Sequence, residues 1–241
     1  MAVTLEIGTG IEIVDLALWI KKEKILIIND LHLGYEEALH RKGILVPKQQ
    51  IQEIIAQIQA ILKKVKPKLI IINGDLKHEF GQVLNQEWKE VLLLFDFLIK
   101  NKLKIIIVKG NHDPILKPIA EKREVSVVKD YLIKNNRSGD LLIAHGDELI
   151  KTGAKRIIIG HEHPAITIRE GSKWEKYKCF LKGNWDGKEL IVMPSFNPLL
   201  EGTNILREKT LSPFLADVSN FSVFIASKGE VFDFGKVGKL K

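Results

Sequence analysis

Short apolar runs alternate with longer amphipathic stretches through the first half of the chain. The segments 11–20 and 24–30, joined by a charged KKE segment, predict a hairpin of two strands. The continuous apolar runs 68–74 and 103–110 predict strands that are covered on both faces. This half of the chain therefore supplies several strands of one sheet.

Two stretches between these strands carry apolar residues at helical spacing. The first, 47–66, opens with a proline and ends with basic residues, and the second spans about 86–101. Alternating strands and helices imply right-handed crossovers and a mainly parallel sheet. From Val125 onward, short strands separated by Gly, Asn and Asp turns predict a second, more antiparallel sheet. We expect one α/β domain over residues 1–241, a two-sheet β-sandwich flanked by helices.

Composition and charge narrow the class of protein. The chain has 37 Lys and Arg against 30 Asp and Glu, a net charge of +7 spread evenly along it, which permits a nucleic-acid partner without requiring one. The single Cys179 excludes a disulfide framework and a thiolate metal cluster, and it fits a reducing cytoplasm. The N-terminus does not resemble a signal peptide, and the longest apolar run, 91–99, is about half of the ~20 residues that a membrane span needs. We expect a cytoplasmic protein without a membrane segment.

Five of the seven histidines directly follow predicted strands, together with aspartates and an asparagine. Strand ends in an α/β sheet open on one edge, so these side chains are expected to converge on one crevice. Adjacent glycines permit the sharp turns that such convergence needs. The residues lie in five short motifs: Asp30 and His32 in DLH, Asp75 in GD, Asn111, His112 and Asp113 in GNHD, His145 in AHGD, and His161 and His163 in GHEH.

The donor types in these motifs indicate a metal centre. Carboxylate, imidazole and carboxamide groups without a thiolate suit Mn²⁺, Fe, Zn²⁺ or Ni²⁺. They outnumber the ligands that one ion needs, and two ions sharing a carboxylate would serve phosphate-ester cleavage by holding the attacking and departing oxygens together. Taken singly, His145 is more often a hydrogen-bonded core residue, and Asp30, Asp75 or Asp113 a helix N-cap. The ordered set favours the metal centre.

The order DLH, GD, GNHD, a lone histidine and GHEH resembles the calcineurin-like metallophosphoesterases, whose fold is such a sandwich. The segments DLHLGYE, GDLKHEF and MPSFNPLLEG also resemble the small SbcD-related phosphoesterases of archaea and their ligase-associated bacterial relatives. The resemblance implies two divalent ions, with Mn²⁺ favoured. It implies one ion held by Asp30, His32 and His163, a second held by Asn111, His145 and His161, and Asp75 as the bridge.

The same resemblance implies a mechanism. A hydroxide that bridges the two ions would attack phosphorus in line, since metal coordination lowers the pKa of water from about 16 to about 7. His112 would not be a ligand; it would stabilise the transferring oxygens or protonate the leaving alkoxide. Asp113 would orient His112 through a hydrogen bond. His112 and Asp113 are therefore the candidate catalytic pair.

Two further histidines keep more than one interpretation. His78 either faces the pocket and touches a phosphate oxygen or lies on the surface of a helix that begins at GDLKH. His40 is expected in solvent, although with Arg41 and Lys42 it could form a basic rim on the substrate side. His78 and Arg41 are thus candidate substrate-binding residues. Three aromatic residues of the strand-rich region are expected to pack rather than to stack on bases: Trp174, Tyr177 and Trp185.

The sequence predicts a metal-dependent phosphodiesterase or phosphatase that acts on nucleotides or other small esters. A Mn²⁺-dependent DNA nuclease of the SbcD type is the alternative, although the about 80 residues after His163 leave no room for both a DNA-capping region and an ATPase-docking segment. The DRG extension of protein Ser/Thr phosphatases is absent after Asp75. A non-catalytic scaffold, an alternative of another class, would not need the full ligand set. The oligomeric state stays open.

Overall fold

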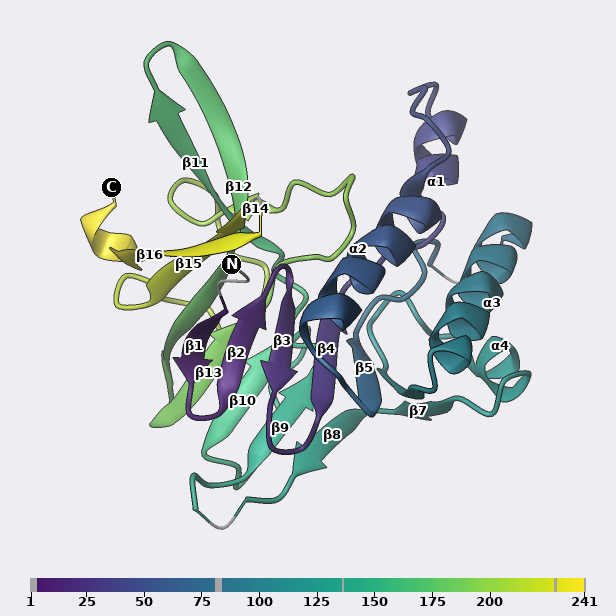
Figure 1. Cartoon of the computed structure of the whole chain (residues 1–241). Helices are drawn as coiled ribbons and strands as arrows, with labels where there is room; N and C mark the ends of the chain where they lie inside the picture. Colours follow the sequence, from purple (N-terminus) through teal and green to yellow (C-terminus); the bar gives the residue numbers. More distant parts are fainter. Residues whose placement is uncertain (1–3, 81–83, 136, 228, 241) are drawn as a thin grey trace.

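Two β-sheets pack face to face, and helices cover the outer face of the first sheet (Figure 1). The computed structural model describes residues 4–80, 84–135, 137–227 and 229–240. The expected α/β fold with two sheets is thereby confirmed. None of the helices in these ranges is long and apolar enough to cross a membrane.

The first sheet has its strands in the order of the sequence. They are β1 (Leu5–Gly8), β2 (Ile11–Val14), β3 (Ala17–Ile20), β4 (Ile25–Asn29), β5 (Leu69–Asn73), β6 (Lys104–Val108) and β7 (Ser126–Val128). Strands β4, β5 and β6 are parallel, as the alternation of strands and helices predicts. The segment 11–20, expected as one strand, forms two because Asp15 adopts a left-handed backbone (φ 58°) and reverses the chain.

Amphipathic helices bury one stripe against this sheet, close to the ranges that helical spacing predicts. The helices are α1 (Tyr35–Arg41), α2 (Gln50–Lys64), α3 (Asn85–Lys100), α4 (Lys117–Glu121) and the 3-10 turn η1 (Val237–Lys239). Ile58 of α2 and Leu94 of α3 join Ile70 and Ile72 of β5 in one buried core. This core covers the face of the first sheet that points away from the second.

The second sheet is mixed and contains the strands that follow β7. They are β8 (Asp130–Ile133), β9 (Leu141–Ala144), β10 (Arg156–Ile159), β11 (Pro164–Glu170), β12 (Lys173–Trp185), β13 (Lys188–Val192), β14 (Thr203–Asn204), β15 (Ser222–Ser227) and β16 (Glu230–Lys236). Strand β10 lies parallel between β9 and β13, whereas β12 pairs antiparallel with β11, β13 and β15. The turn-rich second half of the sequence thus forms a largely antiparallel sheet.

Alternate side chains of both sheets meet in a second core. Ile27 and Ile71 of the first sheet pack with Ile143, Ile158 and Phe180 of the second. The two sheets are therefore fixed against each other close to the strand ends that carry the predicted motifs.

The outer face of the second sheet is covered differently from that of the first. Phe214, Leu215 and Phe221, from an irregular segment, pack on Ile159 and Val192. Within the described ranges, α-helices flank the sandwich on the first sheet alone. The reason lies in the sequence after Val125, where the apolar residues come in short clusters without helical spacing.

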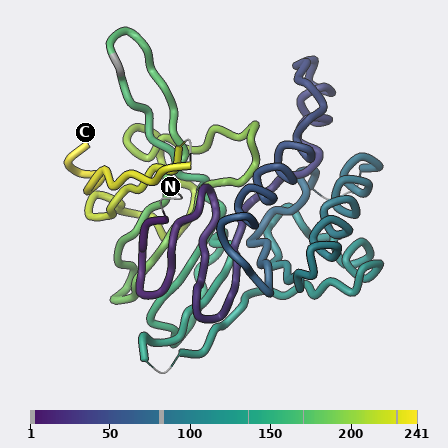
Figure 2. Tube along the Cα trace, in the orientation of Figure 1, coloured from purple at the N-terminus to yellow at the C-terminus, as the bar shows by residue number. Residues whose placement is uncertain are grey.

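Strand β12 is long, and its two ends have different neighbours. Lys173 to Lys178 pair with β11, whereas Leu181 to Trp185 pair with β13. The β11–β12 hairpin therefore projects beyond the body of the sandwich as a two-stranded arm (Figure 2).

Candidate metal centre

Side chains that follow β4, β5, β6, β9 and β10 converge at one edge of the sandwich. Two groups of them bring their donor atoms within 4.8 Å of one another: Asp30, His32 and His163 in the first group, and Asp75, His145 and His161 in the second. Asn111 joins the second group, because its Oδ1 lies 2.9 Å from Nε2 of His145. The structure thus brings together all seven residues that the sequence proposes as ligands.

Asp75 lies between the two groups. Its Oδ2 is 3.7 Å from Nε2 of His32 and 3.5 Å from Nε2 of His145. Its Oδ1 accepts a hydrogen bond from the backbone N–H of His112 at 2.9 Å. One carboxylate oxygen therefore faces both groups while the other is fixed by the main chain.

Asp30 is the most deeply buried member of the first group. Its Oδ2 accepts the backbone N–H of His161 at 2.8 Å. Nε2 of His163 approaches the same oxygen at 3.0 Å but without the alignment of a hydrogen bond. On the other side, Nδ1 of His145 is 3.4 Å from Oδ1 of Asp30. The carboxylate of Asp30 thus links the DLH, AHGD and GHEH motifs.

Four of the converging residues have a left-handed backbone. The φ angle is 47° at Asp30, 44° at His32, 64° at His161 and 50° at His163. Such conformations cost about 1–3 kcal/mol each and persist where the surroundings enforce them. Here the N–H of His32 donates to the carbonyl of Asp75 at 2.9 Å, and Oγ of Ser195 donates to the carbonyl of Asp30 at 2.7 Å. The fold therefore holds strained turns that aim alternate side chains into one point.

Two glycines are needed for space as much as for turns. Gly74 (φ 79°) lies directly against the ring of His145, and Gly110 lies against Asp75. A Cβ at either position would overlap these side chains. The glycines of GD and GNHD thus allow the two loops to approach the ligand candidates closely.

Burial and neighbouring charges shift the pKa values of Asp30, Asp75 and His145 at the metal centre. Burial alone would raise the pKa of Asp30, but His163 and His145 hold that pKa well below its usual value. Burial also opposes the shift at Asp75, where the neighbouring His145 and His32 lower the pKa. Burial would lower the pKa of His145, yet Asp30 and Asp75 raise it well above its usual value. Both carboxylates are therefore anionic at neutral pH, and His145 holds a proton between them.

Two other imidazoles are neutral. Burial and then the charge of His163 lower the pKa of His32 to about 3, against the pull of both carboxylates. Burial and then His145 lower the pKa of His161. A neutral imidazole is the form that binds a metal ion. These two rings are thus ready to act as ligands at physiological pH.

Several buried donor atoms in this cluster have no hydrogen-bond partner among the described residues. They are Oδ1 of Asp30, both ring nitrogens of His32, Nδ1 of His145 and Nε2 of His163. A buried polar atom without a partner costs about 1–3 kcal/mol. Divalent ions such as Mn²⁺, Zn²⁺ or Fe²⁺ take nitrogen and oxygen donors of these types. The donor set therefore fits metal ions, which would complete its missing interactions.

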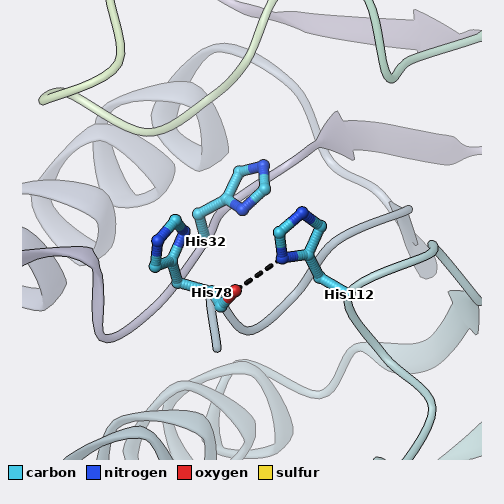
Figure 3. Close-up of side chains that lie close together, drawn as sticks. All are labelled: His32, His78 and His112. Carbon is cyan, nitrogen blue, oxygen red and sulfur yellow. Dashed lines mark hydrogen bonds between the residues drawn. The ribbon is translucent and has the colours of Figure 1, made fainter. Parts of the chain in front are cut away.

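His112 lies beside the first group, and its orientation differs from the expectation. Its Nδ1 is 2.5 Å from the backbone carbonyl oxygen of His78, which fixes the ring (Figure 3). The expected hydrogen bond from Asp113 is replaced, because the Asp113 carboxylate is buried and accepts three backbone N–H groups, from Leu76, Lys77 and Gly110. Burial and then Asp75 raise the pKa of Asp113 to about 6. Asp113 thus joins two loops, and the carbonyl of His78 orients His112.

Comparison with known proteins identifies the family. Residues 23–182 match the sequence model of the calcineurin-like phosphoesterases. The chain belongs to this family. Its members are metal-dependent hydrolases of phosphate esters, which places this chain in the same class of enzymes. No curated protein matches the sequence significantly.

Solved structures of low sequence identity are similar to this phosphoesterase. The nuclease MPE of Pseudomonas putida has a TM-score of 0.66 and 18% identity, over 96% of this chain and 99% of its own. A protein of unknown function from Aquifex aeolicus has a TM-score of 0.39 and 18% identity, over 58% of this chain and 78% of its own. A predicted phosphoesterase from Streptococcus pneumoniae has a TM-score of 0.34 and 15% identity, over 88% and 97%. The likeness to the nuclease supports the fold, and the other two carry no further argument.

In this phosphoesterase His78 lies in an irregular loop and not on a helix. Its half-buried ring packs between Tyr35, with centroids 4.8 Å apart, and His112, at 5.7 Å. Donor atoms of His78, His32 and His112 lie within 4.8 Å of one another, so the ring faces the crevice. Burial and then His112 lower the pKa of His78 to about 4, which leaves it neutral.

The end of α1 carries the residues of the possible basic rim, whose role toward a substrate stays a prediction. Arg41 lies 3.6 Å from Glu37 on its own helix, and no contact with the metal centre is found for it among the described residues. His40 is half-buried, and its Nε2 is 2.7 Å from the carbonyl oxygen of Val46. Lys42, by contrast, is close enough to His78 to help lower the pKa of that ring. Arg41 stays a predicted substrate-binding residue, and the positive charge of Lys42 also acts on His78.

Ser195, Asn197 and Lys178 form a hydrogen-bonded brace behind the metal centre, which the sequence motifs do not predict. Nδ2 of Asn197 donates to the carbonyl of His32 at 3.4 Å, as Ser195 does to that of Asp30. Nζ of Lys178 donates in turn to the backbone carbonyls of Ser195 and Asn197, and burial lowers the pKa of this lysine to about 7. The MPSFN segment carries the one sequence signal for this brace. A lysine within a strand gives none.

A cavity of about 490 Å³ opens beside Asn111 and His145. Lys109 and Lys129 are among its lining residues. Lys129 pairs with Glu148 at 2.6 Å, whereas no ion pair of Lys109 is found within the described part of the chain. Lys109 therefore places a positive charge on the wall of this cavity, which Asp147 also lines.

Proposed function

We propose that this chain is a dinuclear metal-dependent phosphoesterase that hydrolyses phosphodiesters or phosphomonoesters of nucleotide type or other small esters. The observation that carries the proposal is the position of Asp75, whose Oδ2 faces His32 at 3.7 Å and His145 at 3.5 Å. A carboxylate shared by two ions needs this placement between two sets of donors. Two-metal centres of this kind favour in-line displacement at phosphorus.

Each group of donors would hold one ion. Asp30, His32 and His163 would bind the first, and Asn111, His145 and His161 the second, with Asp75 shared. Unpartnered atoms in both groups support this division. Mn²⁺ is the ion that we favour, and iron, Zn²⁺ and Ni²⁺ suit the same nitrogen and oxygen donors.

Two bound ions supply an activated water nucleophile near neutral pH and neutralise charge on the phosphate. The protein supplies the proton for the leaving group. The Nδ1 of His112 is engaged by the carbonyl of His78, so in the protonated ring it is Nε2–H that donates to the leaving alkoxide. The backbone N–H of His112 also donates to Oδ1 of Asp75. This hydrogen bond fixes the position of His112, the proposed proton donor, relative to the shared carboxylate.

The exposed aromatic ring of Phe80 lies next to His112. Phe80 is 62% exposed, and its ring stands edge-on to His112 with centroids 5.7 Å apart. A planar leaving group, such as a nucleoside or an aryl alcohol, can pack on an exposed ring of this kind. The arrangement supports nucleotide-type esters as the substrate class.

A second candidate is a Mn²⁺-dependent DNA nuclease. It is favoured by the likeness to the nuclease MPE, which extends over 96% of this chain and 99% of that nuclease. Turnover under Mn²⁺ on linear DNA, compared with cyclic and linear dinucleotides, separates the two enzymes. A clear preference for linear DNA would replace the small-ester proposal by the nuclease.

The metal-dependent chemistry itself is tested on one preparation. Protein reconstituted with Mn²⁺ should bind about two ions per chain and hydrolyse bis-p-nitrophenyl phosphate. Asp75→Asn should reduce the bound metal and abolish this turnover, because the shared carboxylate is lost. Fewer than one ion bound, together with no hydrolysis, would favour a non-catalytic scaffold. An unchanged rate in Asp75→Asn would contradict the bridging role.

A further inference from the structure

Trp174 does not pack in the core, contrary to the expectation from its place in the strand-rich region. Its side chain is 52% exposed on the projecting β11–β12 hairpin, whereas the ring of Trp185 packs on Phe214 with centroids 4.6 Å apart. Two guanidinium groups lie over the indole, Arg169 at 5.5 Å and Arg207 at 4.8 Å from its centroid. We call Arg169, Trp174 and Arg207 the hairpin site.

The fold holds these three residues in place. Arg169 is the cross-strand neighbour of Trp174, so both side chains project from the same face of the hairpin. Arg207 comes from the turn after β14, where its N–H donates to the carbonyl of Asn204 at 3.0 Å. Nδ2 of Asn204 donates to Oγ1 of Thr167 on β11 at 2.9 Å, which ties this turn to the hairpin. The hairpin site is therefore preformed.

A cavity of about 540 Å³ lies against the hairpin site. This volume is within the range of roughly 300–1,000 Å³ that is usual for small-molecule sites. Its remaining walls are largely apolar, with Ile166, Ile168, Leu206 and Phe234 among them. A ligand in this cavity would contact aliphatic and aromatic groups on one side and two cations on the other.

Neither arginine of the hairpin site forms an ion pair with a carboxylate that the structure describes. Nε of Arg169 donates to the backbone carbonyl of Gly171 at 2.9 Å. Glu208, next to Arg207 in the sequence, lies 3.7 Å from Lys176 instead. Two guanidinium groups thus remain available to an anion, at the edge of an apolar cavity.

We propose that the hairpin site binds a nucleotide unit, with its base stacked on Trp174 and its phosphate held by Arg169 and Arg207. The planar guanidinium group matches phosphate oxygens in pairs, and an indole stacks on any base. An inorganic anion alone would leave the exposed part of the indole and the apolar walls uncovered. A purely apolar ligand would leave both cations unpaired. A free nucleotide and a single-stranded segment of nucleic acid share the required chemistry.

The hairpin site is separate from the metal centre. Arg169 follows His163 by six residues along β11, which at about 3.3 Å per residue is roughly 20 Å. A nucleotide bound there does not touch the donors of the metal centre. The inference therefore goes beyond the proposed reaction and does not depend on it.

Binding is measured on the full chain in the presence of EDTA, so that no probe is hydrolysed. A fluorescein-labelled oligothymidylate is followed by anisotropy, and AMP by calorimetry. Arg207→Ala and Trp174→Ala should each weaken binding by about tenfold or more, since each removes a phosphate or stacking contact. Trp174→Phe keeps an aromatic face and should retain most of the affinity. Lys89→Ala is the matched control, because it removes one exposed positive charge from α3, away from the hairpin (Figure 1).

The outcomes separate the sources of the ligand and the two proposals. Binding of the oligonucleotide alone assigns the hairpin site to a nucleic-acid strand, and binding of AMP assigns it to a free nucleotide. No binding of either probe, or equal affinities in wild type, Arg207→Ala and Trp174→Ala, would overturn the proposal. Hydrolysis of bis-p-nitrophenyl phosphate under Mn²⁺ should be unchanged in Arg207→Ala. Failure of the hairpin site and failure of the phosphoesterase are therefore seen in different assays.

Discussion

The protein buries two clusters of charged side chains, and they differ in how their polar atoms are satisfied. One is the metal centre at the strand ends. The other, which we call the glutamate cluster, consists of Glu36 in the first turn of α1 and of Glu87 and Glu90 in the first two turns of α3. Both clusters are shielded from water, so burial by itself does not distinguish them.

Hydrogen-bond donors meet the carboxylates in the glutamate cluster. Oε1 of Glu36 accepts the backbone N–H groups of Gln49 and Gln50 at 2.6 and 2.5 Å, where α2 begins. Oε2 of Glu90 accepts the N–H of Gly34 at 3.0 Å. Free N–H groups at a helix start favour an anionic partner of this kind. The hydrogen bonds of Glu36 and Glu90 therefore join parts of the chain next to α1, α2 and α3.

In the metal centre, by contrast, buried donor atoms of Asp30, His32, His145 and His163 have no partner among the described residues. The left-handed, strained turns at Asp30 and His32 occur there as well. A buried charge therefore marks no function in this protein. Buried charged groups whose donor atoms lack hydrogen-bond partners and that sit on a strained backbone do, because the fold tolerates both costs where a ligand removes them.

The largest expected difference between the metal centre and the glutamate cluster comes from the same carboxylate-to-amide change made in each. Asp30→Asn should reduce Mn²⁺-dependent hydrolysis of bis-p-nitrophenyl phosphate by about a hundredfold or more, because the amide cannot neutralise an ion and presents an NH₂ group to the N–H of His161. Glu90→Gln should leave the turnover nearly unchanged. A comparable loss in both variants would remove the distinction between the clusters.

His112 sharpens the comparison, since one of its ring nitrogens is bonded and the other is free for chemistry. His112→Gln should lower turnover by about 10²–10⁴-fold on an unactivated alkyl ester. The loss should be much smaller on a p-nitrophenyl ester, whose leaving group departs without a proton. Mn²⁺ affinity, measured by calorimetry, should not change. Wild-type turnover on both esters would show that His112 transfers no proton.

The convergence of the strand-end residues is predictable because four of the five motifs, all but DLH, join a donor side chain to a neighbouring glycine. Asp75 follows Gly74, and Asn111 follows Gly110. The residue that permits the turn and the residue that supplies the donor atom are therefore neighbours in the sequence. How the donors divide between two ions stays a prediction. The partner of His112 is a different case. The carbonyl of His78 has no sequence signature, since every residue carries one, and the expectation therefore fell on Asp113.

The fold was predictable where apolar periodicity is strong and not where a single residue decides. The helices α2 and α3 follow from helical spacing, and the parallel strands β5 and β6 follow from continuous apolar runs that alternate with these helices. The turn at Asp15 depends on one left-handed residue inside an apolar segment. The exposure of Trp174 depends on how far β12 extends beyond its neighbours in the second sheet. Neither property is encoded in local composition.

A finer test of the metal centre uses pH. Burial lowers the pKa of His145, but Asp30 and Asp75 outweigh it and raise that pKa well above its usual value, so a metal ion must displace a proton. His32 and His161, whose pKa values are lowered, release none. Mn²⁺ affinity should therefore rise with pH, by up to about tenfold per unit from about pH 6 to about pH 8. Titrations that give the same affinity across this range would contradict the protonated state of His145.

The smallest effect concerns the stability of the glutamate cluster. Glu90→Gln should lower the free energy of unfolding by about 1–3 kcal/mol, because the new NH₂ group meets the N–H of Gly34 or the amide of Gln86. Burial, and then the charge of Glu36, raise the pKa of Glu90, so the folded state holds its proton more tightly than the unfolded state. This contribution to stability is complete below the unfolded pKa of 4.5 and is lost as the pH rises through the folded pKa.

Urea unfolding with and without Mn²⁺ measures how much stability each variant loses, and the two clusters should respond differently to the ion. The cost of Glu90→Gln should be largest in acid, should shrink toward neutral pH, and should be the same with and without the ion, because each of its lost hydrogen bonds lies within the protein. Asp30→Asn should behave in the opposite way: its cost should grow when Mn²⁺ is added, since only the wild type gains binding energy from the ion. A cost of Glu90→Gln that depended on Mn²⁺ would mean that the glutamate cluster and the metal centre are one coupled unit.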